Sequence, residues 1–98
     1  MSLALHLAHM LIQNSLHARS LTHLSVKIQG SSLYIYSLDK QQDESCRAAL
    51  TMFAGNLFML SVANPKGQWQ PVPYFGQPSE LLSVLTNKFA FALSRWSK

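Results

Sequence analysis

The stretch that decides the fold is residues 24–36, which read LSVKIQGSSLYIY. In its first half every second residue from Leu24 is apolar, which is the pattern of a strand with one buried face. Gly30 then tolerates the positive φ of a tight turn. From Leu33 onward, aliphatic residues alternate with tyrosines, so both tyrosines share the face opposite the aliphatic side chains. We therefore predict a β-hairpin over residues 22–38.

Two further strands are expected after this hairpin. Residues 39–45 are polar and carry three of the four carboxylates, which indicates a loop. Residues 46–54 fit either a helix or a strand, because alanine, leucine and methionine are good helix formers. The Gly-Asn pair at 55–56 favours the strand, since it would turn the chain into a second hairpin with residues 57–63.

A fifth strand depends on the segment that follows. The sequence NPKG at 64–67 is typical of a turn. Residues 68–70 would return as a short strand. Pro71 and Pro73 would end that strand or confine it to a sheet edge, because proline cannot donate a backbone hydrogen bond.

A helix with a wide apolar arc is expected before the hairpin, from a cap at Ser2 to about His17. Its apolar residues form two stripes at spacings of three and four. One stripe contains Leu3, Leu7, Met10 and Leu11, with Asn14 continuing it, and the other contains Leu5, Ala8, Ile12 and Leu16. A helix that rests on one sheet needs a single stripe, so the extra width predicts a second contact, within the fold or with a partner chain.

A second helix is expected at the end of the chain. Gly76 and Pro78 prepare its start, and Glu80 places negative charge where a helix N-terminus favours it. Its apolar stripe continues to about Trp96. Together these elements predict one α+β domain over residues 1–98.

The expected architecture has two layers: an N-terminal helix, an antiparallel meander of four strands, or five if residues 68–70 pair, and a C-terminal helix. Both helices would pack on one face of the sheet. This order of elements resembles that of several small dimeric domains, including secretion chaperones. Those proteins are typically acidic, whereas this chain has a formal net charge of +4. An outline of the fold alone carries little functional information.

Composition argues against most enzyme classes. Charged residues make up 12% of the chain, against about 25% in an ordinary globular domain. The four carboxylates, which acid–base and metal chemistry need, all follow position 38. The single cysteine, Cys46, excludes an internal disulfide, and we expect a reducing, cytoplasmic location. No apolar run reaches the roughly 18 residues of a membrane span. The acid-free start leaves a transit peptide as an alternative.

The histidines and the cysteine are the first candidates for chemistry. His6, His9 and His17 are expected to form the exposed side of the first helix. A metal site at His6 and His9, or a pH-sensitive interface, remains an alternative. No supporting ligand motif accompanies them, so we expect no metal and no cofactor. Cys46 lacks the flanking motif of a nucleophile, and we expect no catalytic residue.

The segment from Trp69 to Phe75 is a candidate binding surface, because two prolines stiffen a stretch with three aromatic residues. Tyr74 belongs to it, and Val84 and Phe91 lie off the main stripe of the last helix. The complete candidate surface for a partner or a second copy is Trp69, Tyr74, Phe75, Val84, Phe91 and Ile12.

Two functions of different kinds follow. The first is a non-catalytic interaction or assembly domain that acts as a homo-oligomer, most simply a homodimer, and binds a protein partner. The alternative is a nucleic-acid module in which bases stack on a face that carries Lys27, Tyr34 and Tyr36. The eight basic residues are spread along the chain, which favours the first.

Overall fold

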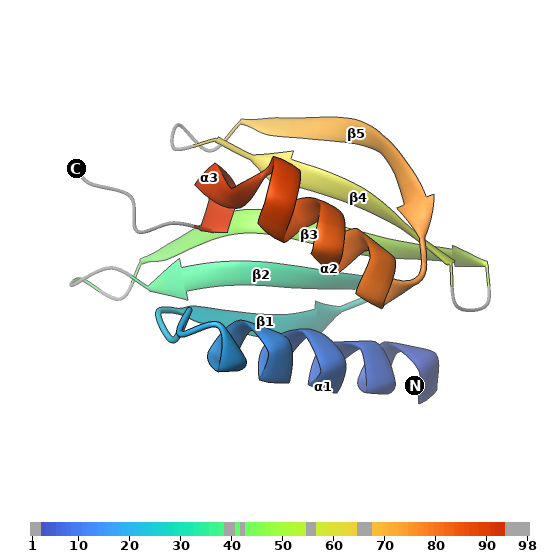
Figure 1. Cartoon of the computed structure of the whole chain (residues 1–98), viewed down its shortest axis with the longest axis horizontal. Helices are drawn as coiled ribbons and strands as arrows, with labels where there is room; N and C mark the ends of the chain where they lie inside the picture. Colours follow the sequence, from blue (N-terminus) through green and yellow to red (C-terminus); the bar gives the residue numbers. More distant parts are fainter. Residues whose placement is uncertain (1–2, 39–40, 42, 55–56, 65–67, 94–98) are drawn as a thin grey trace.

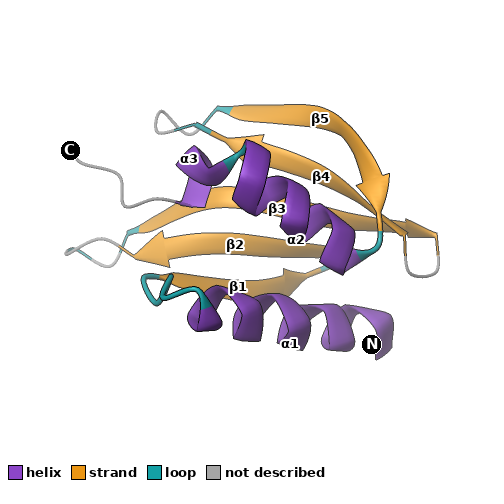
Figure 2. Cartoon of the chain, viewed as in Figure 1, coloured by secondary structure: helices purple, strands orange, loops and turns teal. Residues whose placement is uncertain are grey.

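The computed structural model describes residues 3–38, 41, 43–54, 57–64 and 68–93. It contains three helices and one sheet of five antiparallel strands in the order β1-β2-β3-β4-β5 (Figure 1). The helices are α1 (Leu3–Ala18), α2 (Pro78–Lys88) and α3 (Ala90–Leu93). The strands are β1 (Leu24–Gln29), β2 (Ser32–Leu38), β3 (Glu44–Ala54), β4 (Leu57–Ala63) and β5 (Trp69–Gly76). The helices pack on one side of the sheet, so the predicted two-layer α+β fold is confirmed (Figure 2).

The meander follows the alternation of the sequence. Gly30 takes a φ of 64° at the turn of the predicted hairpin between β1 and β2. The ambiguous segment 46–54 is a strand, because β3 pairs with β2 on one side and with β4 on the other. A strand with two neighbours is stabilised by hydrogen bonds that outweigh its modest helix propensity.

The fifth strand is longer than the prediction, since β5 continues through positions 71 and 73 to Gly76. Its place in the sheet explains this difference. β5 pairs only with β4. On its outer side an edge strand has no neighbouring strand to hydrogen-bond. A proline whose nitrogen faces that side therefore breaks no hydrogen bond of the sheet.

The core lies between the sheet and the helices. Its largest fully buried side chains come from every element except β5 and α3, and the largest of them is Phe58 of β4. The helices contribute the stripe Leu5, Ala8, Ile12 and Leu16 from α1, and Leu81, Leu82 and Leu85 from α2. One of the two apolar stripes of α1 is therefore used inside the fold.

The last helix differs from the prediction because it bends at Phe89, between α2 and α3, and Trp96 lies outside the described residues. The carbonyl groups at the end of a helix lack partners within it. In α3 the Ala92 carbonyl accepts from Arg47 Nη1 at 2.9 Å and the Leu93 carbonyl accepts from His23 Nε2 at 2.9 Å. Both donors lie on the sheet side, so the bend places these carbonyls against their donors.

Arg47 connects three elements of the fold. Besides its bond to α3, its Nε and Nη2 atoms donate to Ser37 Oγ of β2, at 3.2 and 3.0 Å. Both side chains are buried. Burial lowers the pKa of the Arg47 guanidinium, although arginine keeps its charge in proteins.

Both edges of the sheet are protected. α1 lies along β1, and His9 Nε2 is 2.8 Å from the Val26 carbonyl oxygen (Figure 1). A carbonyl oxygen only accepts, so Nε2 of His9 carries the proton of this bond. At the opposite edge, β5 carries its prolines. Covered or proline-bearing edges resist pairing with other strands. Of the helices described here, none is long and apolar enough to cross a membrane.

Candidate interaction surface

The second face of the sheet is not covered by any described helix, and we call it the open face. Strand register defines it: Lys27 pairs with Tyr34, Tyr34 with Ala49, and Ala49 with Ser61, so these side chains point to the side opposite the core. The open face includes Ser25, Lys27, Gln29, Ser32, Tyr34, Tyr36, Leu38, Glu44, Cys46, Ala49, Thr51, Phe53, Met59, Ser61, Ala63, Trp69, Pro71 and Phe75.

Two aromatic pairs stand on the open face. The rings of Trp69 and Tyr34 meet edge to face with centroids 6.3 Å apart, and those of Phe53 and Phe75 meet in the same way at 5.5 Å. Trp69 is 43% exposed and Phe75 is 61% exposed. Edge-to-face contacts hold rings in a preferred orientation, so these aromatic surfaces are oriented before any partner arrives.

Small side chains lie on the two strands between Tyr34 and Trp69. Ala49 of β3 pairs with Tyr34 and is buried, and Ser61 of β4 pairs with Ala49. Thr51 follows Ala49 along the open side of β3, and its Oγ1 lies 3.1 Å from Ser32 Oγ. Trp69 and Phe75 are six residues apart on β5, which is roughly 20 Å along a strand. An extended segment of about six residues would span that distance.

The open face carries little charge. The strands contain three charged residues, of which Arg47 faces the helices. The other two, Lys27 and Glu44, form an ion pair with Nζ 2.6 Å from Oε2. Its hydrogen bond to Glu44 raises the pKa of Lys27. Lys27 Nζ also lies 5.1 Å from the centroid of the Tyr36 ring.

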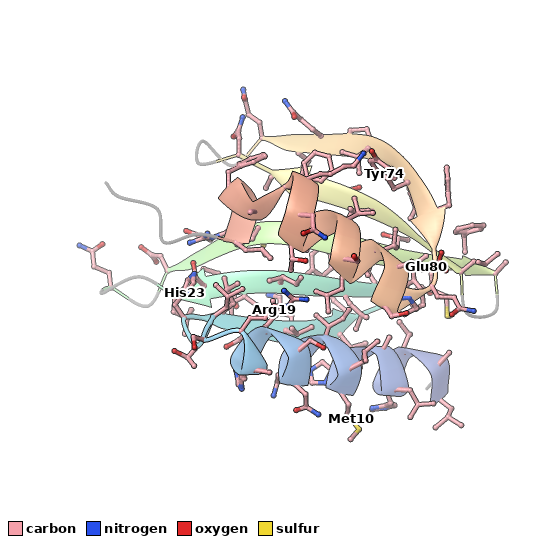
Figure 3. All side chains as sticks on the ribbon, viewed as in Figure 1. Met10, Arg19, His23, Tyr74 and Glu80 are labelled. Atoms are coloured by element: carbon pink, nitrogen blue, oxygen red, sulfur yellow. The ribbon has the colours of Figure 1, made fainter. Side chains whose placement is uncertain are left out.

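The structure brings together only part of the predicted surface. Trp69 and Phe75 share the open face, whereas Tyr74 points to the helix side (Figure 3). There its ring meets Phe89 at 6.2 Å, and its hydroxyl oxygen accepts from Lys88 Nζ at 3.0 Å. Because side chains alternate between the two faces along β5, Tyr74 lies on the opposite face from Trp69 and Phe75.

The remaining predicted surface residues lie elsewhere. Ile12 is fully buried in the core, so its place on a surface is corrected: of the two stripes of α1, its own is the one that packs against the sheet. Val84 is half-buried and packs against the core. Phe91 is exposed on α3, with its ring 6.3 Å from that of Phe89.

Sequence reasoning missed Phe53 and Met59 as members of the open face. Phe53 lies two residues beyond Thr51 on β3 and so shares its side of the sheet, at an irregularity that leaves it without a partner on β4. Met59 lies opposite Phe75 in the register of β4 and β5. Alternation along a strand was therefore a usable signal for both residues.

The histidines and the cysteine were the alternative candidates for chemistry. Among the described residues, no three His, Cys, Asp or Glu side chains gather as a metal site requires. Within α1, His6 is exposed and His9 hydrogen-bonds β1. Cys46 is a half-buried thiol on the open face.

One pocket lies where the end of α1 meets α2 and α3. Its volume is about 260 Å³, and its lining is mostly apolar, with Leu93 and Thr86 among its walls. Arg19, labelled in Figure 3, lies at its side. Ligand pockets usually measure about 300–1,000 Å³ and hold several convergent polar groups. This pocket is smaller and lacks such a constellation among its lining residues, so the open face is the stronger candidate.

No protein-family model, curated protein or solved structure matches this chain. Its function is therefore inferred from its own geometry and chemistry.

Proposed function

We propose that this chain is a non-catalytic protein-interaction domain that acts as a homo-oligomer and holds a segment of a partner protein on its open face. The exposure of Trp69 and Phe75 on that face carries the proposal. Tryptophan and other large aromatic residues dominate the binding energy of protein interfaces. Here they stand on a paired sheet, so little conformational entropy is lost when a partner binds them.

The chemistry of the open face favours an extended partner segment with apolar side chains. The two aromatic pairs offer contact to such side chains, and the ion pair of Lys27 with Glu44 adds no net charge. The sparse carboxylates and the lone Cys46 support a non-catalytic role in a reducing compartment, which we propose to be the cytoplasm.

Selection from a random peptide library tests this proposal. We expect selected peptides to bind the wild-type chain and to shift the backbone resonances of β2 to β5. The double variant Trp69→Ser/Phe75→Ser should lose this binding. Phe91→Ser, which removes an exposed ring on α3, is the matched control and should bind normally. Peptides that bind the double variant as well as the wild type would contradict the proposal.

A nucleic-acid module is the second candidate, because Lys27, Tyr34 and Tyr36 lie together on the open face. Aromatic residues beside a cation can stack the bases of a single strand. The ion pair with Glu44 weighs against it, since Lys27 is already neutralised. Retention of labelled single strands at low salt, weakened by Lys27→Gln, would favour this candidate. No binding at low salt would end it, because the electrostatic attraction is strongest there.

A further inference from the structure

The outer side of α1 presents an apolar stripe that the fold does not use. Leu3, Leu7 and Met10 are 73%, 58% and 59% exposed, and Leu11 is exposed beside them. Figure 3 shows Met10 pointing away from the sheet, on the far side of α1. The opposite side of the same helix fills the core.

Charge is absent from this helix. The sequence of α1, LALHLAHMLIQNSLHA, contains no Asp, Glu, Lys or Arg. A helix on the surface of a monomer usually carries charged residues on the side that faces water. The exposed side of α1 has leucine and methionine instead, which is the composition of a side that another molecule covers.

The spacing of the stripe indicates that a helix covers it. Leu3, Leu7, Met10, Asn14 and His17 are separated by four, three, four and three residues, and all five are exposed. This is the spacing with which two helices pack along a common seam, and an asparagine is tolerated in such seams because it fixes their register. We call these five residues the α1 seam.

We infer that the α1 seam packs against the same seam of a second copy of this chain. Within the described residues, α2 buries its leucines Leu81, Leu82 and Leu85 in the core, and the exposed large apolar side chain of α3 is Phe91 alone. α1 is therefore the described helix with a continuous exposed apolar stripe. A two-fold axis places one surface on its own copy. Because the seam carries no formal charge, the copies do not repel each other there.

Other occupants fit less well. A site for an anionic membrane surface or an acidic helix needs several basic side chains beside the apolar stripe. α1 contains no Lys or Arg, and among the residues just beyond it only Arg19 is a Lys or Arg. The uncharged, apolar composition of the α1 seam therefore suits contact with an identical seam better than contact with a charged partner.

The strength of the contact follows from its size. A standard stable interface buries about 800 Å² on each partner. The leucine and methionine side chains of the seam supply its apolar centre but not that whole area. We therefore expect a dimer with a dissociation constant in the micromolar range.

Sedimentation equilibrium of the full chain, between about 1 and 200 µM, tests the inference. We expect a mass that rises from monomer to dimer. Leu7→Gln should raise the dissociation constant about 100-fold, because the substitution acts on both copies and each buried leucine contributes roughly a factor of ten. Met10→Gln is a second variant with the same expected direction. Phe75→Gln, equally exposed but on the open face, should leave the dissociation constant unchanged.

The inference rests on the homo-oligomer part of the proposed function, and the outcomes separate the two. A dimer that Phe75→Gln dissociates while Leu7→Gln and Met10→Gln do not would overturn the α1 seam and leave the homo-oligomer in place. A monomer throughout would overturn both, while peptide binding to the open face is measured independently. Co-sedimentation of the monomer with anionic phosphatidylserine vesicles, lost in Leu7→Gln, would overturn the second copy in favour of a lipid surface.

Discussion

Two leucines of α1 provide a matched test of how this helix is oriented. Leu16 is fully buried, whereas Leu7 is 58% exposed on the opposite side. Leu→Ala in a core removes apolar contacts and leaves a cavity, which costs about 2.7–5 kcal/mol. Leu16 lies near the end of α1, where the chain can partly close the gap, so we expect a loss of about 3 kcal/mol in the free energy of unfolding. Leu7→Ala should change it by no more than about 0.5 kcal/mol.

Urea unfolding followed by circular dichroism measures this difference. The experiment is run at low micromolar concentration, where the proposed pairing of α1 helices contributes little. For Leu16→Ala we expect a lower midpoint with an unchanged slope, and a fall in Tm of roughly 12–24 °C for a domain of this size. Equal losses for Leu16→Ala and Leu7→Ala would refute the assignment of the buried and exposed stripes.

Three further substitutions probe local contacts. His9→Ala should cost about 1 kcal/mol of folding free energy in urea unfolding, because it removes the bond to the Val26 carbonyl; no loss would show that the bond contributes nothing. Gly30→Ala should cost about 1–2 kcal/mol, since an alanine is strained at a φ of 64° although space is available; a stabilised variant would contradict that backbone conformation. Glu44→Gln should lower the pKa of Lys27, which the pair raises, as NMR titration would report. Because that pKa is raised by folding, the pair stabilises the fold below the ordinary lysine pKa of 10.5 and is lost as the pH rises through the folded value, so the wild type and Glu44→Gln should converge in stability at high pH.

Much of the fold was predictable because its signals are local. The strand predicted over residues 57–63, between two turn signals, matches β4 at both ends. At the start of α2, Glu80 Oε1 accepts from the backbone N–H of Gln77 at 3.2 Å, as its place near a helix N-terminus led us to expect (Figure 3). Such features depend on residues within one turn of each other.

The observed fold differs from the predicted one where the structure depends on residues that are far apart in the sequence. Beyond the bend at Phe89, the carbonyls of α3 accept from Arg47 and His23, which lie far away in the sequence. The sequence of α1 contains two apolar stripes, and only the packed fold shows that Ile12 belongs to the buried one. Likewise, the length of β5 depends on its edge position, which the order of strands determines.

For the candidate site too, local sequence signals identified some residues, and contacts between distant residues determined the rest. Composition identified Trp69 and Phe75, because prolines and aromatic residues are concentrated around them. Their grouping with Tyr34 and Phe53 required the register of the four strands from β2 to β5. Tyr74 was assigned to the same surface, although alternation along β5 turns it to the helices.

Chemical-shift mapping with a selected peptide tests the central claim most directly. The full chain, labelled with ¹⁵N, is titrated with a peptide that the library yields. If the open face is the binding surface, the largest shifts will lie in β2 to β5, with the Trp69 indole among them, and the Trp69→Ser/Phe75→Ser variant will show none. Shifts concentrated on the helix side, around Tyr74 and Phe91, would contradict the account.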